Sequence, residues 1–357
     1  MIKYLKIDGL NGNNKPLEYN FNDDLNLFTG LNGCGKTTIL KVLWFVNTGR
    51  ILDLFNEVLF QSIKVISDKY EVNITKTEDS LEAVCLKDGI KMFGFQYPFN
   101  INYLQARRDG FDFSKLLSSY SEETIFFPTF RRIEGGFSME RQGMRLRQRN
   151  SFPLKDVLSD LSDELSTEKN QFIASVSTDD IISLLNREYS TIVRDINDLQ
   201  KRQFDIIRRR IKTKKGKNPE EILAAIEKDI NTVEQKRDEA IKPFTALEML
   251  ILKIFHKKGI NMDTITFGDL KNAISSDKLS AGEKQMLSFL CYNTFSKNKV
   301  IFIDEPELSL HPDWQRLLIP TLLKQGNNNQ FFIATHSPFI YTKYPDKEIV
   351  INSDKGE

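Results

Sequence analysis

The feature that most constrains this fold is the run G-L-N-G-C-G-K-T-T at residues 30–38, which fits the phosphate-loop pattern G-x-x-x-x-G-K-[ST]. The largely apolar stretch 25–28 before it is typical of a strand, and residues 39–45 after it are typical of a helix. Glycines let successive backbone N–H groups turn toward an anion, and the helix N-terminus adds its dipole. The run therefore predicts an α/β unit that binds the phosphates of a nucleotide.

Two side chains of this loop have predicted roles. Lys36 is expected to reach the β- and γ-phosphates, and the Thr37 hydroxyl to ligate Mg²⁺. The nucleotide-binding residues expected in this segment are Gly30, Asn32, Gly33, Cys34, Gly35, Lys36, Thr37 and Thr38. The cofactors predicted from them are ATP and Mg²⁺.

Residues 300–306, V-I-F-I-D-E-P, indicate a buried strand that ends in two acids. A carboxylate at the carboxyl end of a parallel strand lies beside a phosphate loop, where Mg²⁺ takes oxygen ligands. We expect Asp304 to hold the metal, directly or through water, and Glu305 to orient or deprotonate the attacking water. A strand ending in a solvated acidic turn is the alternative. The pair predicts an ATP hydrolase rather than a nucleotide holder.

Residues 279–285, L-S-A-G-E-K-Q, precede this strand. Ser280 and Glu283 form the S-x-x-E pattern of a capping box that opens a helix. A capping box leaves Gly282 unexplained, because glycine in a first turn costs about 1 kcal/mol relative to alanine.

The same segment resembles the L-S-G-G-Q signature of ABC-type ATPases. The run E-P-E-L-S-L-H-P at 305–312 is similar to the D-loop of their OLD, RecF and SMC branch, and His336, after the apolar run 331–334, resembles the switch histidine. The resemblance implies that Ser280, Gly282 and Glu283 contact ATP held by a second subunit. It also implies that His336 senses the γ-phosphate. The catalytic residues expected from these motifs are Lys36, Glu305 and His336.

A glutamine that couples Mg²⁺ to the hinge is usual in this family, and two segments could take its place. Gln105 is one candidate. The other is the segment 125–132, I-F-F-P-T-F-R-R, which has no glutamine and resembles AAA15/AAA21-type members. We favour the second.

Residues between the two ATPase halves show a heptad pattern, typical of a helical coiled coil. The seam is expected at Ile182, Leu185, Tyr189, Ile192, Ile196 and Leu199, and again at Leu223, Ile226, Ile230, Val233, Arg237, Ala240, Phe244, Leu247, Ile251 and Ile254. Asn218 and Pro219 are expected as N-cap and first residue of the returning helix, and Pro243 is expected to kink or end it. The predicted arms have about 25–35 residues and span on the order of 40–50 Å.

These patterns predict an α/β fold: an ABC-ATPase head with a phosphate-loop sheet and an antiparallel β lobe near residues 1–30 and 65–95. The head is interrupted by an antiparallel coiled-coil hairpin. The expected domains are residues 1–175, the first half of the head; 176–260, the hairpin; and 261–357, the second half of the head.

Composition places further bounds on the 357-residue chain. Three cysteines, one of them in the phosphate loop, suggest a reducing compartment. No apolar run approaches the ~20 residues that span a bilayer, and the first residues read as a strand rather than a signal peptide. We therefore expect a cytoplasmic protein without a membrane partner.

Although the net charge is only +1, the chain contains two basic clusters. Residues 131–149 carry six arginines against two glutamates, and residues 201–217 carry nine basic residues against Asp205. A solvated face and contact with nucleic-acid phosphates are equally open interpretations.

The resemblance to stand-alone AAA15/AAA21 ATPases implies a protein of anti-phage defence that dimerises around ATP and controls a separately encoded effector such as a nuclease. A RecF- or SMC-like DNA-binding ATPase of repair or chromosome maintenance is the alternative. A transporter subunit fits less well, because of the E-P-E-L-S-L-H-P run and the hairpin.

Overall fold

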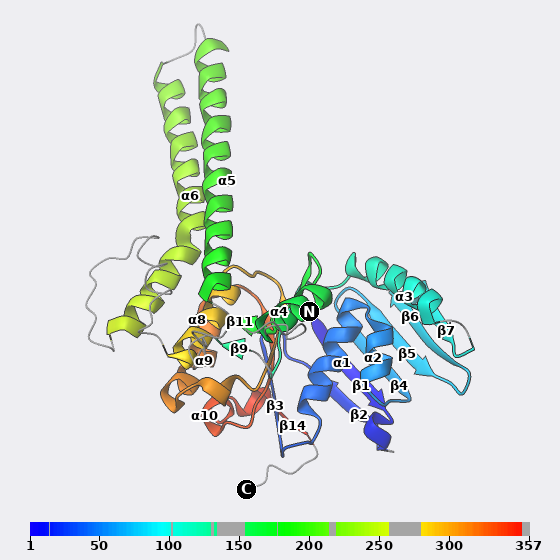
Figure 1. Cartoon of the computed structure of the whole chain (residues 1–357). Coiled ribbons are helices and arrows are strands. Elements are labelled where there is room, and N and C mark those ends of the chain that lie inside the picture. Colours follow the sequence, from blue (N-terminus) through cyan, green and yellow to red (C-terminus); the bar gives the residue numbers. More distant parts are fainter. Residues whose placement is uncertain are drawn as a thin grey trace, which may run out of the picture. The chain divides into compact units, whose positions relative to one another are not determined.

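The computed structural model describes residues 1–13, 15–100, 103–129, 132–133, 154–176, 178–213, 219–256 and 280–351. Their contacts form two compact units (Figure 1). The first unit combines Met1–Val176 with Ser296–Glu357, and the second is Ser177–Phe295. Each unit is described below by itself.

A six-stranded parallel sheet forms one layer of the first unit. Its strands, in spatial order, are β10 (Asn170–Phe172), β8 (Thr124–Phe127), β12 (Val300–Asp304), β13 (Gln330–Ala334), β3 (Leu25–Thr29) and β14 (Glu348–Val350). Every residue of β3, β8, β12 and β13 is buried. Continuous apolar runs are typical of parallel strands covered on both faces, which is why the sequence signalled them clearly.

The second layer is a six-stranded antiparallel sheet. It consists of β2 (Leu17–Asn20), β1 (Ile2–Asp8), β4 (Ser62–Ser67), β5 (Glu71–Lys76), β6 (Ser80–Lys87) and β7 (Ile90–Pro98), in that order. Burial alternates strictly along β4, as expected where one face packs on a core. The predicted α/β head with an antiparallel lobe is confirmed, with residues 25–29 belonging to the parallel sheet.

Helix α1 (Lys36–Thr48) shares a single hydrophobic core with both sheets. Trp44 lies 5.6 Å from the ring of Phe126 in the parallel sheet. On the other side, Asn47 accepts a hydrogen bond of 2.6 Å from the Tyr70 hydroxyl beside the antiparallel sheet. Burial of ten of its residues explains why this helix shows no clean amphipathic stripe.

Shorter helices complete the first unit. They are α2 (Ile51–Glu57), α3 (Tyr103–Ser118), α4 (Leu154–Leu165), α9 (Pro312–Lys324) and α10 (Pro338–Tyr341), with 3₁₀ turns η1 (Leu10–Gly12), η2 (Pro306–Ser309) and η3 (Pro345–Lys347). A separate two-stranded pair joins β9 (Arg132–Ile133) to β11 (Ser175–Val176).

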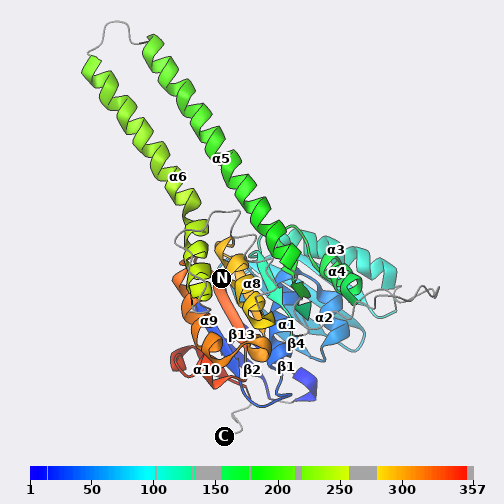
Figure 2. The ribbon, with the colours of Figure 1, turned by 60° about the vertical axis from the view of Figure 1, so that its left-hand side comes forward.

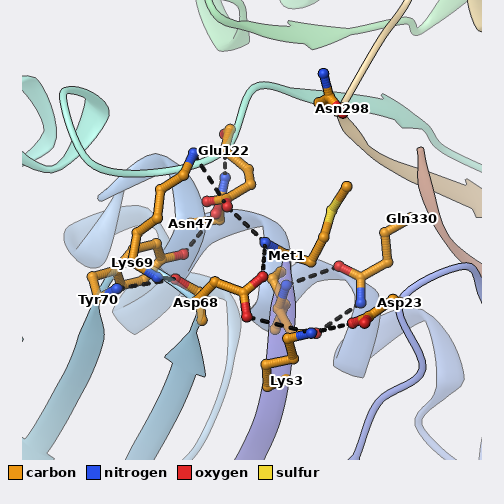
Figure 3. A network of polar contacts seen from close by, with 12 residues as sticks. Met1, Lys3, Asp23, Asn47, Asp68, Lys69, Tyr70, Glu122, Asn298 and Gln330 are labelled. Carbon is orange, nitrogen blue, oxygen red and sulfur yellow. Dashed lines mark hydrogen bonds and ion pairs between the residues drawn. The ribbon is translucent and has the colours of Figure 1, made fainter. Parts of the chain in front are cut away.

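A polar network joins the two sheets where β1 meets β13 (Figure 3). The fully buried Gln330 side chain accepts from Ile2 N at 2.8 Å and donates to the carbonyl oxygens of Ile2 and Asn22, both at 2.7 Å. The ammonium group of Met1 pairs with Glu122 at 2.6 Å and Asp68 at 3.0 Å. Because the Gln330 side chain is fully buried and bonds to Ile2 and Asn22 near the other end of the chain, it fixes one sheet against the other.

The second unit contains the long helices α5 (Thr178–Thr213) and α6 (Pro219–His256), which form the predicted antiparallel hairpin (Figure 2), together with α8 (Ala281–Thr294). The arms have 36 and 38 residues, so each is longer than predicted and spans about 55 Å. Helix α6 begins at Pro219 as expected, whereas Asn218 lies outside the described residues. Helix α8 contacts both arms.

Pro243 does not end the second arm, contrary to one of the two expected outcomes. Helix α6 continues through it to His256, and its direction changes along its length in Figure 1. A proline inside a helix removes one backbone hydrogen bond and tends to kink the helix. Packing at this level compensates: Phe244 is buried and its ring lies 5.5 Å from Tyr189 and 4.9 Å from Phe295.

Burial along the hairpin is uneven. Leu185 and Leu247 are fully buried, while Phe204 and Ile230 farther along are 70% and 43% exposed. Two helices alone cannot enclose a seam on all sides, so the distal apolar residues remain partly in solvent. Of the basic cluster 201–217, the described Lys201, Arg202 and Arg208 are exposed. Most of the 131–149 cluster lies outside the described residues.

Nowhere in the described parts of the chain is there a helix both long and apolar enough to cross a membrane.

Replacing Gln330 with alanine should lower the free energy of unfolding of the first unit by about 2–4 kcal/mol, because buried backbone groups lose their partners. Both tryptophans, Trp44 and Trp314, belong to this unit, so tryptophan fluorescence during urea unfolding reports on it alone. Gln96→Ala, at an exposed glutamine bonded to Glu82, is the matched control. Equal stability of both variants would contradict the bridging role of Gln330.

Candidate nucleotide-binding site

The order of the parallel strands decides which residues meet. Strand β13 lies between β12 and β3, and β8 flanks β12 on the other side. All four run in the same direction, so their carboxyl ends share one edge of the sheet. The phosphate loop after β3, His336 after β13, the acids at the end of β12 and Thr129 after β8 are therefore neighbours.

The glycines of the phosphate loop adopt left-handed backbone angles. Gly30, Gly33 and Gly35 have φ of 135°, 78° and 104°. A Cβ on Gly30 would lie 2.7 Å from the Ile351 carbonyl oxygen, whereas Gly33 and Gly35 face open space. At Gly30 both the backbone conformation and the lack of space disfavour a side chain, whereas at Gly33 and Gly35 only the conformation does. Residues 31–33 form the exposed tip, and Cys34, Thr37 and Thr38 are half-buried.

Helix α1 begins at Lys36 with Gly35 as N-cap, and no side chain caps it. The first-turn N–H groups of an α-helix lack intrahelical acceptors and attract anions. The loop therefore presents backbone donors where a phosphate would bind.

The Lys36 side chain is held by the loop itself. Only 4% of the residue is exposed, and its Nζ donates to the carbonyl oxygens of Gly30 and Leu31, both at 3.1 Å. The same Nζ lies 2.6 Å from Nε2 of His336. A buried ammonium needs such acceptors, and the oxygens of a bound phosphate could replace them.

His336 stands between Lys36 and Glu305. Its Nε2 is 3.1 Å from Oε1 of Glu305. Burial and the adjacent Lys36 ammonium lower the pKa of His336 below its usual value. The imidazole is therefore neutral near pH 7 and can accept a hydrogen bond from the Lys36 ammonium.

Glu305 has φ 50° and ψ 61°, a left-handed conformation that costs a non-glycine residue about 1–3 kcal/mol. Its N–H donates to the Ala334 carbonyl at 2.9 Å, which ties the end of β12 to β13. Strain of this kind is concentrated at functional sites.

Oxygen ligands for a cation converge at the carboxyl end of β12. The Thr37 hydroxyl donates to Oδ1 and Oδ2 of Asp304 at 3.1 and 2.9 Å, and Asp304 is fully buried. Hydroxyl and carboxylate oxygens are the ligands that Mg²⁺ prefers, so the residues fit this ion. The described residues contain no group of three or more His, Cys, Asp or Glu side chains suited to a metal. Phosphate oxygens and water would have to complete the coordination.

Thr129 is a residue that the sequence analysis missed. Its hydroxyl donates to Oδ2 of Asp304. It lies in the favoured segment 125–132, while Gln105 lies in α3, which contacts β7, α1 and α2. Thr129 is the second residue after the buried strand β8, and a polar residue at this position was the available signal.

The expected signature segment lies in the second unit. Ser280 caps α8 in a capping box with Glu283: Glu283 Oε2 accepts from the Ser280 N–H and hydroxyl, both at 2.8 Å, and the Glu283 N–H donates back at 3.4 Å. Ser280 is exposed, whereas Gly282 and Glu283 are buried. The predicted capping box is confirmed, and contact of these residues with a nucleotide remains a prediction.

Comparison with known proteins places this site in a family. The family model described as "AAA domain, putative AbiEii toxin, Type IV TA system" matches residues 25–341. The retron Vc95 probable ATPase of Vibrio cholerae serotype O1 biovar El Tor is 23% identical over 91% of this chain and 68% of its own length. The Septu protein PtuA of Bacillus thuringiensis is 61% identical over 41 residues, which are 12% of this chain and 10% of that protein.

Among solved structures, an Smc head domain from Pyrococcus furiosus with an extended coiled coil, bound to the C-terminal domain of ScpA, matches with a TM-score of 0.41 and 15% identity. The match covers 98% of this chain and 92% of that one. Since the family model covers most of the chain and includes the phosphate loop, the acids Asp304 and Glu305, and His336, the chain is an ATPase that belongs to this AAA-domain family.

Proposed function

We propose that this protein is an ATP-gated dimer that controls a separately encoded effector in anti-phage defence. The observation that carries the ATP-dependent part is the row of Lys36, His336 and Glu305 at one edge of the parallel sheet. An ammonium, a neutral imidazole and a carboxylate within hydrogen-bonding distance suit phosphoryl transfer to water.

In this proposal each side chain has a separate task. Lys36 binds the β- and γ-phosphates, and His336 contacts the γ-phosphate through the nitrogen that now faces Lys36. Glu305 orients the attacking water and accepts its proton. Thr37 and Asp304 would hold Mg²⁺, which supplies neutralisation of phosphate charge.

The signature residues Ser280, Gly282 and Glu283 are proposed to contact ATP bound by a second copy. Support comes from their position at the start of α8, where Ser280 is exposed and the helix N-terminus favours anions. ATP would then join two copies, and hydrolysis would release them.

The defence role rests on the relatives. One is named as a retron ATPase and one as a Septu protein. We propose an effector such as a nuclease as the partner, the cytoplasm as the location, and the hairpin of α5 and α6 as a docking element. The RecF- or SMC-like alternative is favoured by one observation, the exposed Lys201, Arg202 and Arg208 on α5, which could contact nucleic-acid phosphates.

Lys36→Ala should weaken ATP binding by about 10–100-fold, because a charge-assisted contact to phosphate is lost. Isothermal titration with ATP and Mg²⁺ measures the change. Lys41→Ala, which removes a half-buried lysine of the same helix that pairs with Glu57, is the control and should bind as the unmodified protein does. Unchanged affinity of Lys36→Ala would refute the assignment of the phosphate loop.

Glu305→Gln should keep ATP binding, lower kcat at least about 100-fold and accumulate as a dimer with ATP and Mg²⁺. Sedimentation velocity with ATP or ADP measures the dimer. The exposed Glu82→Gln is the matched control. Adding Ser280→Arg to Glu305→Gln should abolish the dimer without abolishing ATP binding. Normal hydrolysis by Glu305→Gln would overturn the role of Glu305.

The effector should be encoded next to this protein and co-purify with it. Co-expression with the neighbouring gene product, followed by affinity purification, tests the complex with ATP or ADP present. Recovery of this protein alone under both conditions, together with DNA-stimulated hydrolysis and salt-sensitive DNA binding, would favour the DNA-maintenance alternative.

A further inference from the structure

Glu307 lies in η2, two residues after Glu305, and its carboxylate reaches the turn that carries His336. Its Oε1 is 2.5 Å from the backbone nitrogen of His336 and 3.1 Å from that of Ser337. The same oxygen accepts the Thr335 hydroxyl at 2.8 Å. One carboxylate oxygen therefore binds donors from three consecutive residues.

That turn needs such a partner. Strand β13 ends at Ala334 and α10 begins at Pro338, so the N–H groups of His336 and Ser337 belong to neither element. Charge-assisted hydrogen bonds are stronger than neutral ones. Glu307 accepts from both groups, and the Ser337 N–H also donates to the Thr335 hydroxyl oxygen at 3.0 Å, so these bonds hold the backbone on either side of the His336 side chain.

A second contact ties the turn to α9. The Oε1 of Gln315 accepts the Ser337 hydroxyl at 2.5 Å, while its Nε2 donates to the Leu310 carbonyl at 2.7 Å. The segment after β12 and the turn after β13 are thus held together on two sides.

The surroundings of the other carboxylate oxygen of Glu307 explain why glutamine is not equivalent to glutamate at this position. Oε2 is buried and has no hydrogen-bond partner among the described residues. In a Glu307→Gln variant the amide NH₂ either occupies this site without an acceptor or, if flipped, faces three donors. The variant keeps the size of the side chain and removes its charge.

We propose that Glu307 is a positioning residue for hydrolysis: it holds the turn of His336 against the segment of Glu305 and so sets the 3.1 Å approach of these two side chains. The inference rests on the proposed roles of Glu305 and His336. It assigns to Glu307 no contact with nucleotide, metal or water.

Selective ¹⁵N-histidine labelling tests the positioning directly. The chain has three histidines, so the spectrum should contain three backbone amide signals, and His336→Ala identifies the relevant one. In Glu307→Gln the His336 amide proton should move upfield, because its bond to an anionic acceptor is weakened. ATP turnover should fall about tenfold, while ATP affinity changes less than about threefold.

Glu348→Gln is the matched control. Glu348, on β14, also accepts a hydrogen bond from a threonine hydroxyl, that of Thr29 on the neighbouring strand β3, at 2.6 Å. This control should leave both the signal and kcat unchanged. Thr335→Ser keeps a hydroxyl donor to Glu307 and should retain activity, whereas Thr335→Val should lose part of it.

Three results for Glu307→Gln would overturn the proposal. They are a lower kcat with the His336 amide signal unshifted, a shifted signal with normal kcat, or a loss of ATP affinity as large as the loss of kcat. Glu307→Gln is close in shape to the original, so the test does not depend on the folding of Glu307→Ala. Absence of ATP hydrolysis by the unmodified protein would instead refute the proposed function, and the amide signal would still report the positioning.

Discussion

The shared edge of the parallel sheet is the constraint on which the candidate site depends. Because β13 lies between β12 and β3, the segment that follows β13 lies between the segments that follow β12 and β3. This order places His336 between Lys36 and Glu305. On the far side of β12, strand β8 brings Thr129 to Asp304. The backbone ladder thus brings together four segments that lie far apart in the chain.

Electrostatic pairing arranges the charged groups at this edge of the sheet. The Lys36 ammonium is buried, and it lies within hydrogen-bonding distance of two carbonyl oxygens and of an imidazole whose pKa is lowered. The Asp304 carboxylate accepts hydroxyl donors from Thr37 and Thr129. Each charged group has a partner that a phosphate or a cation could replace, which keeps the binding groups pre-organised.

Much of the fold was predictable from local patterns, because buried parallel strands and a glycine-rich loop leave strong signals. Strands β3, β12 and β13, helix α1 and the helical hairpin all lie where their patterns indicated. The effect of Pro243 was predicted less well, because packing of Phe244 against Tyr189 and Phe295 lets α6 continue past it. Thr129 escaped notice because a lone threonine after a strand carries no motif.

The sequence by itself determined which functional groups this protein carries: the phosphate loop, the acids Asp304 and Glu305, the histidine at 336 and the capped helix at Ser280 are local patterns whose residue types limit what they can bind. Only the tertiary structure decided their neighbours. The triple acceptance by Glu307, the bridging by Gln330 and the hydroxyl of Thr129 on Asp304 depend on strand order, which brings residues from distant parts of the chain within hydrogen-bonding distance. Such contacts leave no periodic trace in the sequence.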